Sequence, residues 1–173
     1  ANIHNTSKQQ THLQNVKSAI PSATKPKTTT SSTSSSSDEE LKLNPIIDLS
    51  GWQLPQDIDY DVLSNHISGA IIRVFGGSQI SKDSNAASSN GIDKSFKTHI
   101  KELQKRDVPV AVYSYAQGAS VKEMKEEARI FYKNASPYKP TYYWIDVEEE
   151  TMSNMEEGVQ AFLAELKRLG AEK

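Results

Sequence analysis

Short apolar runs and amphipathic stretches alternate four times between Asn44 and Lys173. The apolar runs are rich in β-branched and aromatic residues, which favour strands, and a stretch of helical periodicity follows each of them. Repeated strand–helix units predict an α/β domain with a parallel sheet and right-handed crossovers. Four units fit either half of an eight-stranded (β/α)8 barrel of the TIM type or a small open sheet.

The expected elements follow directly from these runs. Strands are predicted at residues 45–50, 70–75, 110–116 and 142–145, and helices at 59–67, 93–106, 120–135 and 153–169. Ser120 with Glu123, and Ser153 with Glu156, have the spacing of capping boxes, and Gly170 is placed to end the last helix. The residues predicted to face inward on the last two helices are Val121, Met124, Ala128, Phe131, Met155, Val159, Phe162, Leu163, Leu166 and Leu169.

Polar side chains stand at the ends of several predicted strands. Asp48 ends the first strand, Tyr113 and Tyr115 end the third, and Asp146 and Glu148 end the fourth. The carboxyl ends of parallel strands meet at one edge, where α/β barrels place their chemistry. This convergence, and the end of the chain directly after a helix, favour half a barrel over a small open sheet.

The pair Asp146 and Glu148 is the strongest chemical signal. Side chains alternate along a strand, so Trp144, Asp146 and Glu148 share one face, and two residue rises separate the two acids by roughly 6.6 Å. Like charges at this spacing raise one pKa, which suits a general acid beside an ionised partner. The alternative is a solvated acidic turn, which is the expectation for Glu149 and Glu150.

Residues 1–43 are predicted to be a disordered tail or linker, and residues 44–173 the folded domain. The centre of the first segment, residues 28–37, is entirely Ser or Thr and cannot bury enough apolar surface to offset chain entropy. A short helix at residues 12–20 is the one element expected there.

Composition excludes several functional classes. A net charge of −2 argues against nucleic acid as a partner. No apolar run approaches the ~18 residues of a membrane span, so no membrane insertion is expected. The chain has no cysteine, which excludes disulfides and thiolate metal sites.

Two other kinds of site have weaker support. The acids Asp146, Glu148, Glu149 and Glu150 offer hard oxygen ligands for Mg²⁺ or Ca²⁺, but no segment resembles an EF-hand loop. Gly76-Gly77 lacks the phosphate-binding fingerprints. The histidines have no zinc-ligand spacing and are predicted to lie at the surface: His4, His12, His66 and His99.

The segment Asp48-Leu49-Ser50-Gly51-Trp52-Gln53 resembles the first-strand motif Asp-(Val/Ile)-Ser-x-(Trp/Tyr/His)-Gln of the family-25 glycoside hydrolases, bacterial and phage lysozymes acting as muramidases. The resemblance extends over about Pro45 to Lys173, and Ser114 stands where the family usually has His. The other matching segments are Ile58-Asp59-Tyr60, Ile71-Ile72-Arg73, Asp93 to Phe96, Val112-Tyr113-Ser114-Tyr115 and Trp144-Ile145-Asp146-Val147-Glu148.

The resemblance implies an eight-stranded α/β barrel that cleaves the β-1,4 bond after N-acetylmuramic acid in peptidoglycan. It implies Glu148 as general acid, with Asp146 and Asp48 as electrostatic partners, one of which orients the substrate acetamido group. The residues predicted to bind substrate are Trp52, Tyr113, Tyr115 and Arg73. Packing of Trp52 in its loop, a core position for Tyr113 and a strand-end cap at Asp48 are the structural alternatives.

The family domain is longer than this chain, and its strands five to eight have no counterpart here. We therefore expect a fragment that is unstable or inactive alone. The resemblance further implies a monomer outside the cell or at the cell wall, acting on peptidoglycan glycan strands without cofactor or metal. The rival interpretation is a non-catalytic glycan-binding module, which would not need Asp48, Asp146 and Glu148 together.

Overall fold

The computed structural model describes residues 44–76, 86–88 and 90–173. The predicted tail over residues 1–43, with its short helix, lies outside the described residues, as does most of the polar loop at 78–91.

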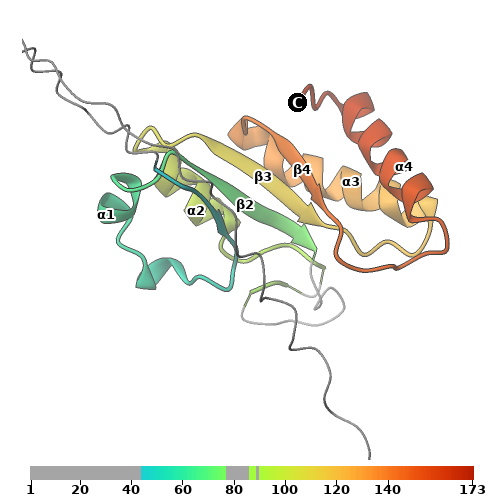
Figure 1. The fold of residues 1–173 in the computed structure, drawn as a ribbon, viewed down its shortest axis with the longest axis horizontal. Helices are drawn as coiled ribbons and strands as arrows, with labels where there is room; N and C mark the ends of the chain where they lie inside the picture. Colours follow the sequence, from blue (N-terminus) through green and yellow to red (C-terminus); the bar gives the residue numbers. More distant parts are fainter. Residues whose placement is uncertain (1–43, 77–85, 89) are drawn as a thin grey trace, which may run out of the picture. The chain divides into compact units, whose positions relative to one another are not determined.

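One parallel sheet has its four strands in the order of the sequence, β1-β2-β3-β4 (Figure 1). The strands are β1 (Ile46–Leu49), β2 (Gly69–Gly76), β3 (Val110–Tyr115) and β4 (Tyr143–Asp146). Each lies within one residue of its predicted bounds. The near-continuous apolar run of β2 fits its place between two neighbours, because an inner parallel strand is buried on both faces.

Four α-helices connect and follow the strands: α1 (Tyr60–Ser64), α2 (Phe96–Gln104), α3 (Val121–Ala135) and α4 (Met155–Leu169). Short 3₁₀ turns lie at Pro55–Asp57 (η1) and Ser136–Tyr138 (η2). The prediction of an α/β domain with a parallel sheet is confirmed. None of the described helices has the length and hydropathy of a membrane span.

The residues that cap α3 and α4 can be compared directly with the capping boxes predicted from the sequence. Ser120 caps α3 as predicted, its Oγ accepting from the Glu123 N–H at 3.2 Å. The predicted box of Ser153 with Glu156 is wrong, because Asn154 caps α4 and accepts from Glu157 N–H at 3.2 Å. Both pairs have suitable residue types at the same spacing, so the sequence does not distinguish them. Gly170 ends α4 with φ 107°, as predicted.

The hydrophobic core lies between the sheet and helices α2 and α3, and α4 packs outside against α3 (Figure 1). Phe131 links these layers, because its ring stacks on Phe162 of α4 and meets Tyr143 of β4 edge-on. Burying a side chain of this size contributes about 1.5–3 kcal/mol. The largest side chains with less than 2% exposure include Phe96, Phe131, Phe162, Ile72, Ile100 and Leu103.

Five of the predicted inward-facing positions are not fully buried. Leu163 is 41% exposed, because α4 buries only the Phe162 and Leu166 side against α3. Val121, Met155, Val159 and Leu169 are only half-buried.

The opposite face of the sheet is not covered by any of the described helices. We call it the open face. Ile46 of β1 is 65% exposed there, and Trp144 of β4 is 52% exposed. The aromatic residues of the predicted fourth strand suggested that it would be buried, but Tyr142 is 50% exposed and Trp144 is 52% exposed, so that expectation is wrong for both. As an edge strand, β4 has only β3 as a neighbour, although its Tyr143 N–H also donates to the Lys173 carbonyl at 3.0 Å.

Candidate active site

The predicted acids and tyrosines meet at the carboxyl edge of the sheet. Parallel register places Arg73 of β2 beside Tyr113 of β3, and Tyr115 of β3 beside Asp146 of β4. Asp48 lies near the end of β1, and Glu148 follows β4 by two residues. Four separate strands thus bring their polar ends to one place, because the crossovers return the chain each time to the same end of the sheet.

Asp48 lies beside the end of a neighbouring strand. The Tyr113 hydroxyl lies near its carboxylate, and the Arg73 guanidinium lies close enough to act on its charge. Desolvation among these side chains raises the pKa of Asp48, and the charge of Glu148 adds to the rise, whereas Tyr113 and Arg73 oppose it. Asp48 is therefore electrostatically coupled to both β3 and the loop after β4.

Asp146 and Glu148 lie close enough for their carboxyl groups to interact. Desolvation raises the pKa of Asp146, and the neighbouring Glu148 and the Asp48 charge raise it further. Burial and neighbouring acids therefore favour the protonated form of Asp146 at the edge of the sheet.

The two tyrosines of β3 are hydrogen-bond donors at neutral pH. Desolvation, followed by the Asp48 charge, raises the pKa of Tyr113. Desolvation and Glu149 raise the pKa of Tyr115 to about 12. The Tyr115 hydroxyl donates to Glu149 Oε1 at 2.9 Å. Glu149, expected to be only part of a solvated turn, is thus exposed but bonded to the site.

Arg73 is buried and held by Asp93, a residue whose role the sequence did not reveal. Its Nε and Nη2 both lie 3.0 Å from Asp93 Oδ2. Asp93, 2% exposed, also accepts from Gly51 N–H at 2.7 Å and Ser95 N–H at 2.8 Å. Asp93 thereby joins β2, the start of α2 and the loop after β1.

Trp52 lies in the loop after β1 and is 55% exposed. The backbone beneath it is fixed, because Ser50 N–H donates to Gln53 Oε1 at 2.9 Å. A Cβ on Gly51 would lie 2.1 Å from the Ala86 carbonyl oxygen, so this loop passes too close to residue 86 for any side chain. The structure thus presents the Trp52 indole to solvent on a fixed backbone.

Comparison with known proteins decides the family. The model of glycosyl hydrolases family 25 matches residues 47–173, which is most of the chain. The chain belongs to glycosyl hydrolases family 25. The resemblance found in the sequence motifs is thereby confirmed.

Solved structures of family 25 proteins agree with this assignment. GHIP, described as a glycosyl hydrolase 25 and virulence factor of Streptococcus pneumoniae participating in host cell invasion, is 60% identical with a TM-score of 0.72. The match covers 75% of this chain and 56% of GHIP, so the chain spans little more than half of that relative. No curated protein matches the chain.

More distant structures share the fold. The catalytic domain of endolysin ply40, from a Listeria monocytogenes bacteriophage, is 21% identical with a TM-score of 0.61, over 74% of this chain and 59% of that one. The S. pneumoniae autolysin LytC, solved with a synthetic peptidoglycan ligand, is 19% identical with a TM-score of 0.57. The match covers 73% of this chain and 30% of LytC.

Within this family 25 chain, His99 corrects a prediction. It is completely buried rather than at the surface. Its Nε2 bonds the Ser50 carbonyl at 3.0 Å, so Nδ1 accepts from the Tyr60 hydroxyl at 2.7 Å. Desolvation lowers the pKa of His99, which keeps the ring neutral. His66 is exposed, as predicted, while His4 and His12 lie outside the described residues.

Ser114, which stands where the family usually has His, is buried, and its Oγ has no hydrogen-bond partner within the described part of the chain.

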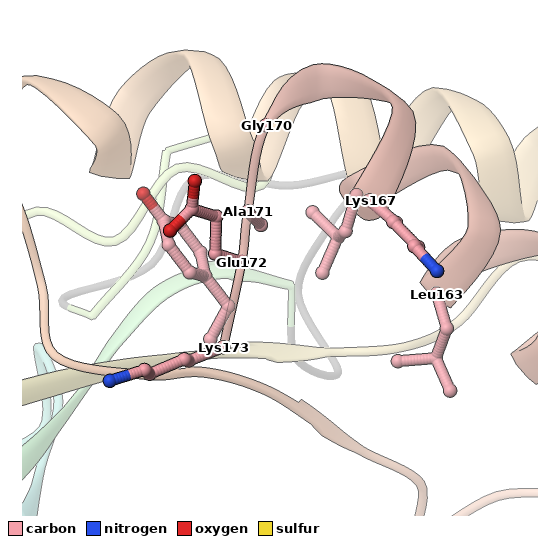
Figure 2. A pocket seen from close by; sticks show the side chains of 8 residues that line it. Leu163, Lys167, Gly170, Ala171, Glu172 and Lys173 are labelled. Carbon is pink, nitrogen blue, oxygen red and sulfur yellow. The ribbon is translucent and has the colours of Figure 1, made fainter.

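A hollow of about 590 Å³ lies beside Leu163, Lys167 and Lys173 (Figure 2). It also touches Tyr143, at the start of β4, and is therefore remote from the acids at the strand's other end.

The described residues contain no group of three or more His, Cys, Asp or Glu side chains arranged to hold a metal ion. The cation site considered for the four acids after Ile145 therefore gains no geometric support from the structure.

Proposed function

We propose that this chain provides the acid cluster of a peptidoglycan hydrolase, a muramidase that cleaves the β-1,4 bond between N-acetylmuramic acid and N-acetylglucosamine. The observation that carries the proposal is the meeting of Asp48, Asp146 and Glu148 at one edge, where their charges act on one another. Family membership supports glycosidase chemistry, and the LytC structure with a peptidoglycan ligand supports the substrate class.

The proposed roles follow from the charge arrangement. Glu148, the more exposed member of the pair, protonates the glycosidic oxygen as the bond to the anomeric carbon breaks. Asp146 stabilises the positive charge that develops on the sugar. Asp48, beside Tyr113, orients the substrate acetamido group, whose oxygen attacks the anomeric carbon.

The aromatic residues are proposed to contact the substrate directly, whereas Arg73 acts through its charge. Trp52 offers an exposed aromatic face to the apolar side of a sugar ring, and Tyr113 and Tyr115 place their rings beside the acids. Arg73 is paired with Asp93 inside the domain, so it acts on the site mainly through its charge beside Asp48.

We also propose that the sheet is part of a (β/α)8 barrel and that its open face is the barrel interior. Strand order that follows the sequence, with the packed helices on one face, supports this interpretation, because a doubly wound sheet would carry helices on both faces. We likewise propose that the protein acts as a monomer, without a cofactor, outside the cell or at the cell wall.

The test is loss of turbidity of a purified peptidoglycan suspension, with new reducing ends assayed. Because the chain is expected to be unstable or inactive as a fragment, the assay compares the chain as given with a version extended through the remaining barrel strands, and each variant is made in both. Glu148→Gln should reduce the rate by about a hundredfold or more, because general acid catalysis contributes 10²–10⁴-fold. Glu150→Gln, an exposed acid in the same loop, is the matched control and should retain the wild-type rate.

An unchanged rate in Glu148→Gln would remove Glu148 as the acid. Retained binding to the glycan with no cleavage by the wild-type chain would favour the binding module, for which the exposed rings of Trp52, Tyr142 and Trp144 offer sugar-stacking surfaces.

A further inference from the structure

The loop between β4 and α4, residues 147–154, carries Glu148 and is mostly exposed. Three hydrogen bonds connect this loop and the end of β4 to the end of β3 and the segment that follows it. Ala116 N–H donates to the Asp146 carbonyl at 2.9 Å, and the Tyr115 hydroxyl donates to Glu149. The third is the shortest, from Thr151 Oγ1 to the Gly118 carbonyl at 2.7 Å.

The segment that accepts the Thr151 bond is itself anchored on α3. Gln117 N–H donates to the Glu127 carboxylate at 3.2 and 3.3 Å, and Gly118 N–H lies close to the same group. Ala119 N–H donates to Glu123 Oε2 at 2.9 Å. The amides on both sides of Gly118 are therefore held by two carboxylates of one helix.

Gly118 lies directly on the first turn of α3. A Cβ at this position would lie 2.8 Å from Met124 N and 3.1 Å from the Glu123 carbonyl carbon. The close approach, with the anchored amides on either side, fixes the direction of the Gly118 carbonyl. The acceptor for Thr151 is thus a rigid part of the helix–loop unit.

Glu127 is unusual because its carboxyl group is buried in the domain. It is 7% exposed, and none of the ion pairs found among the described residues involves it. Desolvation, with a smaller contribution from Glu123, raises its pKa to about 7. A buried carboxyl group without a cation is costly, and its bonds all go to the segment that supports Thr151.

We propose that Glu127 and Thr151 are positioning residues for Glu148: Glu127 fixes the Gly118 carbonyl, and Thr151 bonds that carbonyl and holds the Glu148 loop against Asp146. The role of Glu148 in this inference rests on the proposed hydrolysis. The positioning itself is a property of the loop and can be measured without substrate.

The decisive variant is Thr151→Val in the full chain, which keeps the side-chain shape and removes the hydroxyl donor. Misplacing a catalytic group by about 1 Å can cost roughly a hundredfold, so we expect kcat to fall ten- to a hundredfold with little change in KM. Thr151→Ser should restore most of kcat. Glu127→Gln, which removes one of two acceptors for the Gln117 and Gly118 amides, should lower kcat severalfold.

Thr141→Val is the matched control. The Thr141 Oγ1 also donates to a backbone carbonyl, that of Val110 at 3.0 Å, but at the other end of β4. It should retain the wild-type kcat although it loses a bond of the same kind. A similar fall in kcat for both valine variants would overturn the proposal, because general destabilisation would then explain the effect.

Hydrogen exchange of the amides at residues 147–153 separates this inference from the proposed function. Thr151→Val and Glu127→Gln should speed exchange there, and Thr141→Val should not. If the wild-type chain cleaves no glycan but exchange responds as expected, the proposed function fails and the positioning stands. Unchanged exchange in Thr151→Val overturns the positioning, whatever the activity.

Discussion

The Asp48 end of the acid cluster and the Glu148 end differ in what holds them. Near Asp48, Asp93 binds Gly51 N–H and Arg73, and His99 binds the Ser50 carbonyl, all inside the domain. Near Glu148, the side-chain bonds of the loop itself come from half-buried Thr151 and from Tyr115 to exposed Glu149. Buried polar networks open only with much of the fold, whereas surface loops open locally. The Asp48 end is therefore the fixed reference of the site, and the Glu148 end is the part that can adjust to a substrate.

The largest expected effect is that of Asp93→Asn, which leaves the Arg73 charge buried without its partner. Breaking such a pair typically costs 3–5 kcal/mol of the free energy of unfolding. Urea denaturation measures this loss in the free energy of unfolding. Asp61→Asn is the control, because Asp61 is exposed and pairs with Arg106 Nε at 2.7 Å, so a loss below about 1 kcal/mol is expected. Equal losses would contradict the contrast between buried and surface bonds.

Glu127→Gln should change how stability depends on pH. The folded pKa of about 7 lies above the ordinary value of 4.5 for a glutamate, so the neutral form is favoured on folding. This stability is present below pH 4.5 and is lost as pH rises to about 7, by up to roughly 3 kcal/mol. Urea midpoints at pH 5 and pH 8 should differ less in Glu127→Gln than in the wild type. Glu156→Gln, at an exposed position of α4, should keep the wild-type difference.

His99→Leu is expected to cost about 1–3 kcal/mol, because the Tyr60 hydroxyl and the Ser50 carbonyl both lose a buried partner. The pKa of His99 is lowered on folding, so its contribution to stability is present above the ordinary histidine value of 6.5 and is lost as pH falls below it. Denaturation at pH 8 and pH 5 should show a weaker acid sensitivity in the variant. His66→Leu, at an exposed site, should leave that sensitivity unchanged; a matching change there would count against His99 as the source.

The smallest effect is expected for Tyr115→Phe, which removes the donor to exposed Glu149. The loss in free energy of unfolding should stay within about 0.5–1.5 kcal/mol, the usual net value of one hydrogen bond. Thermal or urea denaturation is sufficient to measure it. A loss as large as that of Asp93→Asn would show that the Glu148 end is embedded as firmly as the Asp48 end.

The sequence predicts the elements well because their signals are local. A β-branched run such as that of β2, or an apolar stripe such as that of α3, specifies its own structure and its inner face. The strand ends followed from the same pattern, which is why Asp48, Tyr113 and Asp146 were expected at one edge. The exposure of Trp144 was not predictable in this way, because it depends on which strands lie beside β4 and on what covers the open face.

The buried polar residues were missed for a different reason. His99 stands at i+3 from Phe96, and Glu127 at i+3 from Met124, so each occupies the apolar side of its helix. That placement was a readable signal of burial. The partners were not readable, because Ser50 and Tyr60 are remote from His99 in the sequence, and the bonds of Asp93 to Gly51 and Arg73 arise only when the strands assemble.

The strand order has a kinetic consequence. Each strand pairs with the strand before it in the sequence, so contact order is low for a parallel sheet and no early segment must wait for a distant one. During synthesis the chain can fold from β1 onward as each unit leaves the ribosome, with β2 supplying the template for β3, and β3 for β4. The acids of β4 would then be the last to join an edge on which Asp48 and Tyr113 are already in place.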